Sequence, residues 1–152
     1  LFDIEFNTLC ESDSTPMHIG SLPGYLRGIA ETISLEDWKP GDCVVHNHPY
    51  KGASHSPDIA VVMPVFHKGE LVGFSANTAH HVDIGAATPG LIIDVPDMWA
   101  EGMLMDAVKL YDGGSRVESL WKYIRDNTRV PGLVMGDLEA QIEINKRGMD
   151  KK

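Results

Sequence analysis

The sequence predicts an α+β protein: a β-rich centre, built on a hairpin that carries the metal-site loops, lies between helices at both ends of the chain. Two runs rich in β-branched and aromatic residues flank a glycine-containing turn in the middle of the sequence. Apolar residues recur at helical spacing before and after this centre. The 152 residues, 43% of them hydrophobic, suit a single domain with a buried core, 1–152, or a fragment of a larger subunit.

The N-terminal part leads from irregular chain into the first strand. Residues 1–15 are poorly patterned, with one short strand candidate at 4–6. A helix is expected over 23–34, because apolar residues recur three and four positions apart and Pro23 suits a first helical turn. After a Pro-Gly turn, residues 43–46 predict a short buried strand that leads into a histidine-rich loop.

The runs 59–66 and 71–76 predict a β-hairpin, because the four residues between them include a glycine. A two-residue loop would place Asp58 opposite Ala79, whereas a three-residue loop with a glycine bulge would place it opposite His80. In either register the two strand ends meet at the open end of the hairpin, where cross-strand Cβ atoms lie about 5 Å apart.

The segment after the hairpin is less regular. Residues 85–96 predict a loop with one apolar cluster at 91–93. The length of 98–111 favours a helix from Trp99, but its last residues, 107–111, also fit a strand.

Two helices are expected near the C-terminus. Apolar spacing predicts one over 117–127, which Pro131-Gly132 interrupts, and another that runs to about residue 146. The charged residues 147–152 are expected to form a frayed tail.

Composition excludes several classes of function. The net charge is −9 and the pI is about 5.1, with no basic stripe, so nucleic acid is not an expected partner. No apolar run approaches the roughly 18 residues of a membrane helix, and no signal-peptide pattern opens the chain. Two cysteines do not make a disulfide framework, so a cytoplasmic location is expected. The chain contains no phosphate-binding glycine loop, hence no nucleotide-binding residues, and no G-x-S-x-G motif of a serine hydrolase.

Six of the seven histidines fall between residues 46 and 81. His55 lies three residues before Asp58, and either hairpin register brings both close to His80. Two imidazoles and one carboxylate leave coordination positions open, as a catalytic metal needs. These three residues are therefore the candidate metal ligands, with a hydrogen-bonded polar loop as the alternative.

Three neighbours of these ligands are further candidates. His81 would point to the other side of the strand from His80, which favours an outer-shell or substrate role. Asp83 could orient a ligand histidine from the second shell, or cap a loop. His48, in the loop before a proline, is a candidate for lining a pocket.

The other histidines have simpler interpretations. His46 ends a strand and is expected to be buried and hydrogen-bonded, and His67 is expected to be solvated in the hairpin turn. His18 fits either helix capping or pocket lining.

A long ordered series of motifs resembles the hydantoinase B/oxoprolinase family and covers roughly residues 16 to 145. The motifs are Gly41-Asp42, His46-Asn47-His48-Pro49-Tyr50-x-Gly52, His55-Ser56-Pro57-Asp58-Ile59, Gly69-Glu70-Leu71-Val72-Gly73-Phe74, Ala79-His80-His81-x-Asp83-Ile84-Gly85 and Thr88-Pro89-Gly90. Within this family the chain is most similar to the metal-bearing large (alpha) subunit of acetone carboxylase. The features that carry this closer resemblance are His48, where hydantoinase-type members usually have Asp, Ala53-Ser54, Arg125 to Pro131 and Gly136 to Gln141.

The resemblance implies an ATP-dependent carboxylase (ligase) subunit that is inactive alone. A hydantoinase A-like partner would use ATP to activate bicarbonate and the ketone, with a small third subunit as a further partner. The family's ligand positions match His55, Asp58 and His80, which would hold a divalent metal, Mn²⁺ first, with Zn²⁺ or Fe²⁺ as alternatives. The metal would stabilise an enolate that attacks CO₂ to give a 3-oxo acid, and His81 or His48 would help to transfer the proton.

Two other functions stay open at this point. The same scaffold would serve ATP-dependent hydrolysis of a cyclic amide, as in N-methylhydantoinases and 5-oxoprolinases, where the metal would polarise a ring carbonyl. Because family subunits are several times longer, and carry an upstream aspartate that residues 1–15 do not clearly match, the chain is expected to be a fragment or a truncated, non-catalytic homologue.

Overall fold

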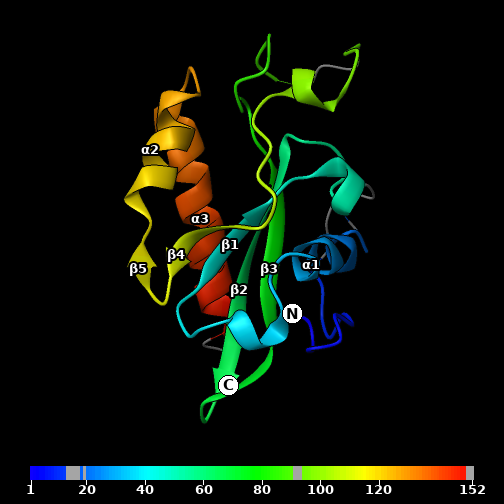
Figure 1. The fold of residues 1–152 in the computed structure, drawn as a ribbon, viewed down its shortest axis with the longest axis vertical. Helices are drawn as coiled ribbons and strands as arrows, with labels where there is room; N and C mark the ends of the chain where they lie inside the picture. The colour runs from blue at the N-terminus through cyan, green and yellow to red at the C-terminus, as the bar shows by residue number, and fades with distance from the viewer. Residues whose placement is uncertain (13–17, 19, 91–93, 150–152) are drawn as a thin grey trace.

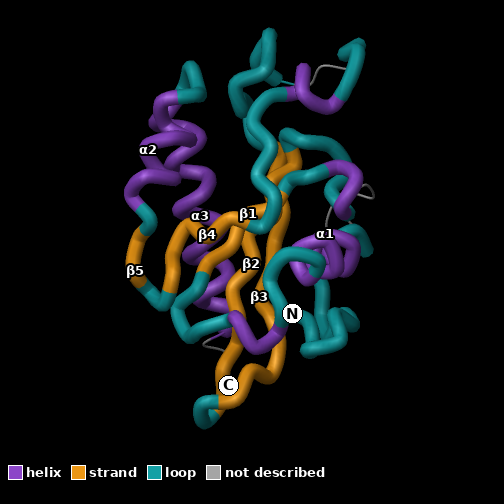
Figure 2. Tube along the Cα trace, viewed as in Figure 1, coloured by secondary structure: helices purple, strands orange, loops and turns teal. Residues whose placement is uncertain are grey.

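The computed structural model describes residues 1–12, 18, 20–90 and 94–149. The described residues form one antiparallel sheet with the strand order β3-β2-β1-β4-β5, and Figures 1 and 2 show its course through the molecule. Its strands are β1 (Cys43–His46), β2 (Asp58–His67), β3 (Glu70–His80), β4 (Val108–Asp112) and β5 (Ser115–Arg116). The long hairpin of β2 and β3 forms one edge of the sheet.

Helices cover both faces of this sheet, which confirms the α+β class. The helix α1 (Leu22–Ala30) lies on one face, and α2 (Glu118–Asp126) and α3 (Pro131–Met149) lie on the other (Figure 1). Short 3-10 helices, η1 (Leu35–Asp37), η2 (Pro49–Lys51) and η3 (Met98–Glu101), lie in the connections. No helix among the described residues combines the length and the hydropathy that crossing a membrane requires.

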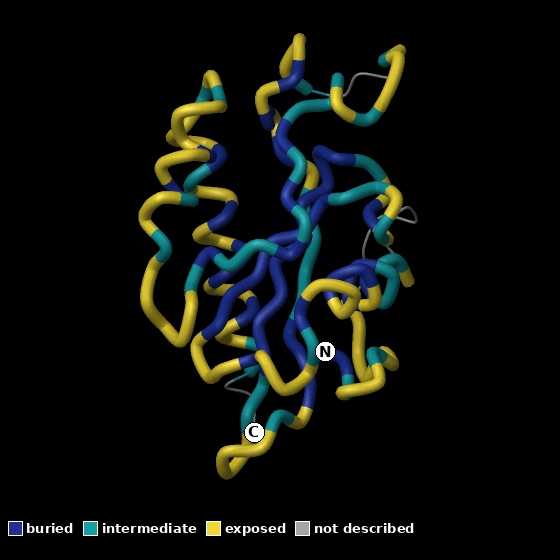
Figure 3. The backbone as a smooth tube through the Cα atoms, viewed as in Figure 1, coloured by how far each residue is buried: buried dark blue, intermediate teal, exposed yellow. Residues whose placement is uncertain are grey.

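Strand alternation divides the apolar residues into two cores, because successive side chains point to opposite faces of a sheet. Val45, Ile59 and Val61 join the core under α2 and α3, whereas Val44 and Ala60 join the core under α1. The central strands are buried on both faces (Figure 3). This pattern explains why 43–46 and 59–66 are continuous apolar runs in the sequence.

The hairpin combines both registers that the sequence left open. Its turn has two central residues, Lys68 (φ 51°) and Gly69 (φ 88°), whose positive φ angles are those of a type I′ turn. A bulge at Val72 then adds one residue to β3, so that Asp58 faces His80. The strand ends therefore pair as the three-residue alternative predicts, although the turn itself is the two-residue one.

Three element boundaries differ from the sequence predictions. The helix α1 ends at Ala30, where 34 was expected. The helix α3 begins at Pro131, because proline fits a first helical turn, and it continues to Met149, so residues 147–149 are helical rather than frayed. The strand candidate at 4–6 is wrong, since in this segment it is Phe2 that bridges to Phe74 and Thr8.

The two alternatives for 98–111 are both partly realised, as the helix η3 followed by the strand β4. The apolar cluster expected at 91–93, and residues 150–152 of the tail, lie outside the described residues.

Glycines let α1 approach the loop before β2 more closely than any side chain would allow. A Cβ on Gly28 would overlap the backbone carbonyl of Lys51, and a Cβ on Gly52 would overlap the carbonyl of Gly24. Backbone therefore packs directly on backbone here. This contact fixes the loop that carries His55 against α1.

Candidate functional site

The three candidate ligands come from two strand ends and the loop between them. Asp58 is the first residue of β2 and His80 is the last residue of β3, directly opposite it. His55 lies in the turn just before β2, where its carbonyl accepts a hydrogen bond from the N–H of Asp58 (3.1 Å). Because Ala60, two residues after Asp58, belongs to the core under α1, the Asp58 side chain lies on the α1 side of the sheet.

Both imidazoles contact one oxygen of the buried carboxylate. Asp58 Oδ1 lies 2.9 Å from His55 Nε2 and 3.0 Å from His80 Nδ1, and these two nitrogens are 3.2 Å apart. The imidazole rings are stacked with centroids 5.0 Å apart. The Asp58 side chain is fully buried, whereas those of His55 and His80 are 19% and 33% exposed. The centre is thus accessible from the histidine side.

This arrangement fits a divalent transition metal. The three ligand atoms lie within 4.8 Å of one another, without another side chain having to move. For a metal bound at about 2.1 Å, neighbouring ligands of an octahedron lie about 3.0 Å apart, close to the separations found here. Two neutral imidazoles and one carboxylate are ligands that Mn²⁺, Fe²⁺ and Zn²⁺ all accept.

His18 adds a further contact to the same carboxylate. Its Nε2 lies 3.2 Å from Asp58 Oδ2, the oxygen that His55 and His80 do not use. From α1, the Tyr25 hydroxyl donates to the Asp58 carbonyl (3.3 Å) and accepts from the N–H of Ser54 (3.2 Å). The α1 side therefore holds both the side chain and the backbone of Asp58.

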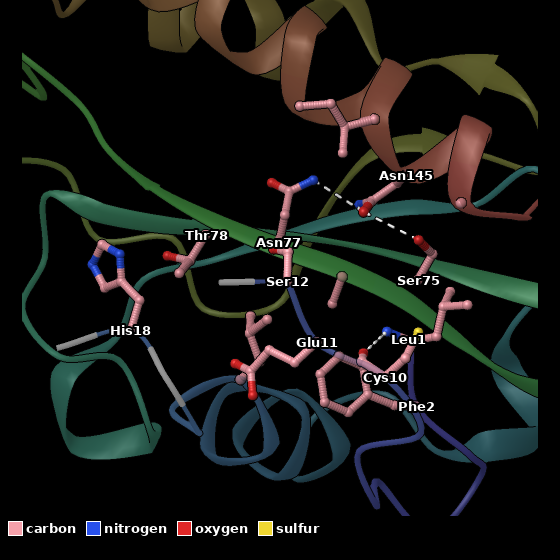
Figure 4. A pocket seen from close by; sticks show the side chains of 14 residues that line it. Leu1, Phe2, Cys10, Glu11, Ser12, His18, Ser75, Asn77, Thr78 and Asn145 are labelled. Carbon is pink, nitrogen blue, oxygen red and sulfur yellow. Dashed lines mark hydrogen bonds between the residues drawn. The ribbon is translucent and has the colours of Figure 1, made fainter. Parts of the chain in front are cut away.

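A cavity of about 440 Å³ lies next to His18, which confirms the pocket-lining alternative for that residue. Its walls come from the N-terminal segment, β3 and the end of α3. Figure 4 shows His18 and Thr78 towards one end of this cavity and Ser75 and Asn145 towards the other. Since Thr78 and His80 lie on the same side of β3, the cavity and the carboxylate occupy the same face of the sheet.

His81 lies on the opposite side of the sheet from His80, as strand alternation predicted. It is 1% exposed, and its Nε2 contacts Gln141 Oε1 on α3 at 2.9 Å. The amide of Gln141 donates in turn to the Ile59 carbonyl and to Asn77 Oδ1 (both 2.9 Å). Burial lowers the pKa of His81 despite this hydrogen bond. The observed contacts of His81 tie the sheet to α3.

Asp83 is buried, but it contacts an arginine rather than a candidate ligand. Among the described residues it accepts hydrogen bonds from the backbone and guanidinium of Arg129 (2.6 and 2.9 Å), the Thr128 hydroxyl and the N–H of Gly85. Burial raises the pKa of this carboxyl, but these donors and the guanidinium charge together bring it below its usual value. The residue joins the loop after β3 to the start of α3.

His46 and His67 lie as expected. His46 is fully buried, with Nε2 donating to the Lys51 carbonyl (2.9 Å) and Nδ1 accepting from the N–H of Ala107 (3.2 Å). Burial lowers the pKa of His46. His67 is exposed near the hairpin turn.

His48 is half-buried at the start of η2. Its Nδ1 is buried and has no hydrogen-bond partner among the described residues. The distances given for the metal candidates do not include His48, so its role stays a proposal.

Two residues that support the ligand loop were missed in the sequence. The fully buried Asn47 side chain donates to the carbonyls of Ser56 (2.6 Å) and Met103 (2.9 Å) and accepts from the N–H of Met105 (2.6 Å). Glu101 accepts from the N–H of Ser56 at 2.9 Å. These contacts join segments more than forty residues apart, and no local spacing announces them.

Comparison with known proteins places this geometry in a family. The profile of the hydantoinase B/oxoprolinase family matches residues 1–151. A protein named as a putative D-/L-hydantoinase B subunit, from a Pseudomonas strain, is 46% identical over 99% of this chain and 26% of its own length.

Two solved structures share the fold. The ATP-dependent caprolactamase of Pseudomonas jessenii matches with a TM-score of 0.84 and 31% identity, over 97% of this chain and 26% of that one. A nucleotide-free acetone carboxylase matches with a TM-score of 0.68 and 20% identity, over 83% of this chain and 17% of that one. The chain thus spans about a quarter of the hydantoinase subunit and of the caprolactamase chain.

Proposed function

This chain belongs to the hydantoinase B/oxoprolinase family, and from that premise we propose that it forms the metal-binding part of an ATP-dependent enzyme that hydrolyses cyclic amides. The observation that carries the proposal is the convergence of His55 Nε2, Asp58 Oδ1 and His80 Nδ1 at the open end of the hairpin. The names of a hydantoinase subunit and an ATP-dependent caprolactamase among its relatives support amide hydrolysis over ketone carboxylation.

The three side chains would hold one divalent cation, Mn²⁺, Zn²⁺ or Fe²⁺. When bound, such an ion acts as a Lewis acid on a carbonyl oxygen. Asp58 brings the negative charge that balances a cation in a buried position, and the two imidazoles fix the direction of approach. Because His80 is the most exposed of the three, substrate would reach the centre from its side.

The ATP-dependent step would take place on another subunit. The chain has no glycine loop that could bind phosphates, and one relative is named as the B component of a hydantoinase. We therefore assign ATP use to a hydantoinase A-like partner, with room for a small third subunit in the assembly.

Carboxylation of a ketone is the second candidate function. His48 favours it, since the hydantoinase-type proteins that the sequence resembles usually have Asp at this position. The buried, unpartnered Nδ1 of His48 is a group that could hold or move a proton near the substrate. Acetone with bicarbonate, a hydantoin and a lactam, each supplied with ATP and the partner subunit, would separate the two reactions.

Metal content tests the proposal directly. Wild type, His55→Ala, Asp58→Ala and the control His67→Ala are loaded with Mn²⁺ or Zn²⁺, dialysed and analysed for bound metal, after circular dichroism has verified equal foldedness. About one ion in wild type and His67→Ala, lost from both ligand variants, is the expected result. Equal metal in all four proteins, or none in wild type, would remove the proposed centre and favour a non-catalytic homologue.

A further inference from the structure

The carboxylate of Asp58 is engaged at both oxygens, and only one of them faces the histidine pair. Oδ1 contacts His55 and His80, whereas Oδ2 contacts His18 Nε2 at 3.2 Å. An aspartate that carries metal through one oxygen is free to rotate unless something holds the other. In this fully buried position, His18 contacts that other oxygen.

The proton on His18 can be assigned from this contact. An ionised carboxylate only accepts hydrogen bonds, so Nε2 of His18 must be the protonated nitrogen. We propose that His18 is a positioning residue of the metal centre, whose Nε2–H holds Oδ2 of Asp58 so that Oδ1 stays turned towards His55 and His80. This inference rests on the proposed function, because it assumes that Asp58 is a metal ligand.

His18 is itself held in place by the approach to α1. Its carbonyl accepts hydrogen bonds from the N–H (3.2 Å) and the hydroxyl (2.9 Å) of Ser21. One turn into the helix, Tyr25 is fully buried and donates to the Asp58 backbone carbonyl. The same segment therefore fixes the aspartate from two directions, which is the geometry that a positioning role requires.

His18 also forms the boundary between the carboxylate and the cavity. Its side chain is 14% exposed and lines the cavity that Figure 4 shows. A direct ligand would have to turn its Nε2 from Oδ2 towards the ion, and this would break the hydrogen bond that orients Asp58. Outer-shell partners of this kind commonly change metal affinity by about 10- to 100-fold.

The test compares three substitutions of His18 that differ in reach. His18→Gln places an amide N–H near the position of Nε2, His18→Asn is polar but too short, and His18→Ala removes the group. Affinities for Mn²⁺ and Zn²⁺ are measured by titration calorimetry, and Co²⁺ binding is followed by visible absorption. His67→Ala, which removes an exposed histidine elsewhere, is the control.

The expected pattern is a weakening of about 10- to 100-fold in His18→Ala and His18→Asn, with His18→Gln within about threefold of wild type. The Co²⁺ spectrum should be the same in His18→Gln and wild type, because the ligand set does not change. His67→Ala should bind as wild type does. If His18→Ala does not fold, the comparison of Gln with Asn still decides the matter.

Two results would overturn the inference. Unchanged affinity in His18→Asn would mean that His18 only packs against the centre. Equal losses in His18→Gln and His18→Asn, with an altered Co²⁺ spectrum, would make His18 a direct ligand. Either result leaves the proposed function intact, which fails separately if wild type binds no metal or if His55→Ala and Asp58→Ala bind it normally.

Discussion

The two faces of the sheet are built differently. Under α2 and α3 lies an extended apolar core that includes Trp121 and Leu138, and buried amides such as Gln141 tie α3 to the strands. Under α1 the core is joined by close backbone contacts at glycines and by the polar side chains of Asp58 and His18. Because strand alternation separates the faces, one can supply most of the stability while the other holds the candidate site.

The largest expected effect is on the α3 face. Leu138→Ala should lower the free energy of unfolding by about 2–5 kcal/mol, because this fully buried side chain leaves a cavity. Metal affinity of the folded protein should not change, since the ligands lie on the other face. Urea denaturation and titration calorimetry would measure the two quantities. Leu133→Ala, 61% exposed on the same helix, should stay within about 0.5 kcal/mol of wild type.

Parallel losses of stability and metal affinity in Leu138→Ala would show that the faces are not independent. The comparison drawn above would then be wrong, and the whole sheet would act as one unit.

A second break on the α3 side concerns Asp83. Asp83→Asn removes the charge that receives the N–H groups of Arg129 and should cost about 1.5–3 kcal/mol at neutral pH. The pKa of Asp83 is lowered by folding, so its contribution is present above the unfolded value of about 4 and is lost as the pH falls through the lower folded value. Unfolding free energies between pH 7 and pH 3 should therefore fall less steeply in the variant.

An unchanged acid dependence in Asp83→Asn would mean that other carboxyls control unfolding at low pH. Asp97→Asn, which removes a charge in an exposed cap, is a suitable reference because its carboxyl accepts only from the N–H of Ala100 among the described residues.

The same small substitution should have opposite signs on the two faces. Gly28→Ala on α1 would force its Cβ into the Lys51 carbonyl and should destabilise the protein by about 1–3 kcal/mol. It should also weaken metal binding, because the loop before His55 must move. Thermal denaturation and metal titration of the variant would measure both effects.

The smallest effect is expected from Gly136→Ala, which serves as the matched control. No described atom lies within 4 Å of a Cβ at this helical position, so alanine should stabilise α3 by about 0.5–1 kcal/mol. A loss of stability here, or none in Gly28→Ala, would contradict the close-contact explanation.

The sequence predicted the parts of this molecule that depend on local pattern. The strand at Cys43–His46 and the hairpin were confirmed, and so was the meeting of Asp58 with His80, one of two registers considered. The bulge at Val72 that selects this register has no local signal, since it follows from how the strands pack. The start of α3 at Pro131 was misread because proline both interrupts and begins helices.

The surroundings of the site could not be predicted, because they depend on contacts between distant segments. Asp83 pairs with Arg129, 46 residues away, and His18 meets Asp58 across 40 residues. Neither spacing belongs to a helix or a strand. The convergence of the three candidate ligands was predictable only because the hairpin makes two of them neighbours.

The unequal lengths of the hairpin strands determine which changes of chain length the centre could survive. The strand β2 has 10 residues and β3 has 11, and the bulge at Val72 takes up the difference. Deleting Val72 would leave a regular hairpin that still aligns Asp58 with His80. Inserting one residue between the bulge and the strand end would bring Ala79 into that place, whereas removing one would bring His81 there. The adjacent histidines thus make shortening of this strand less damaging to the centre than lengthening.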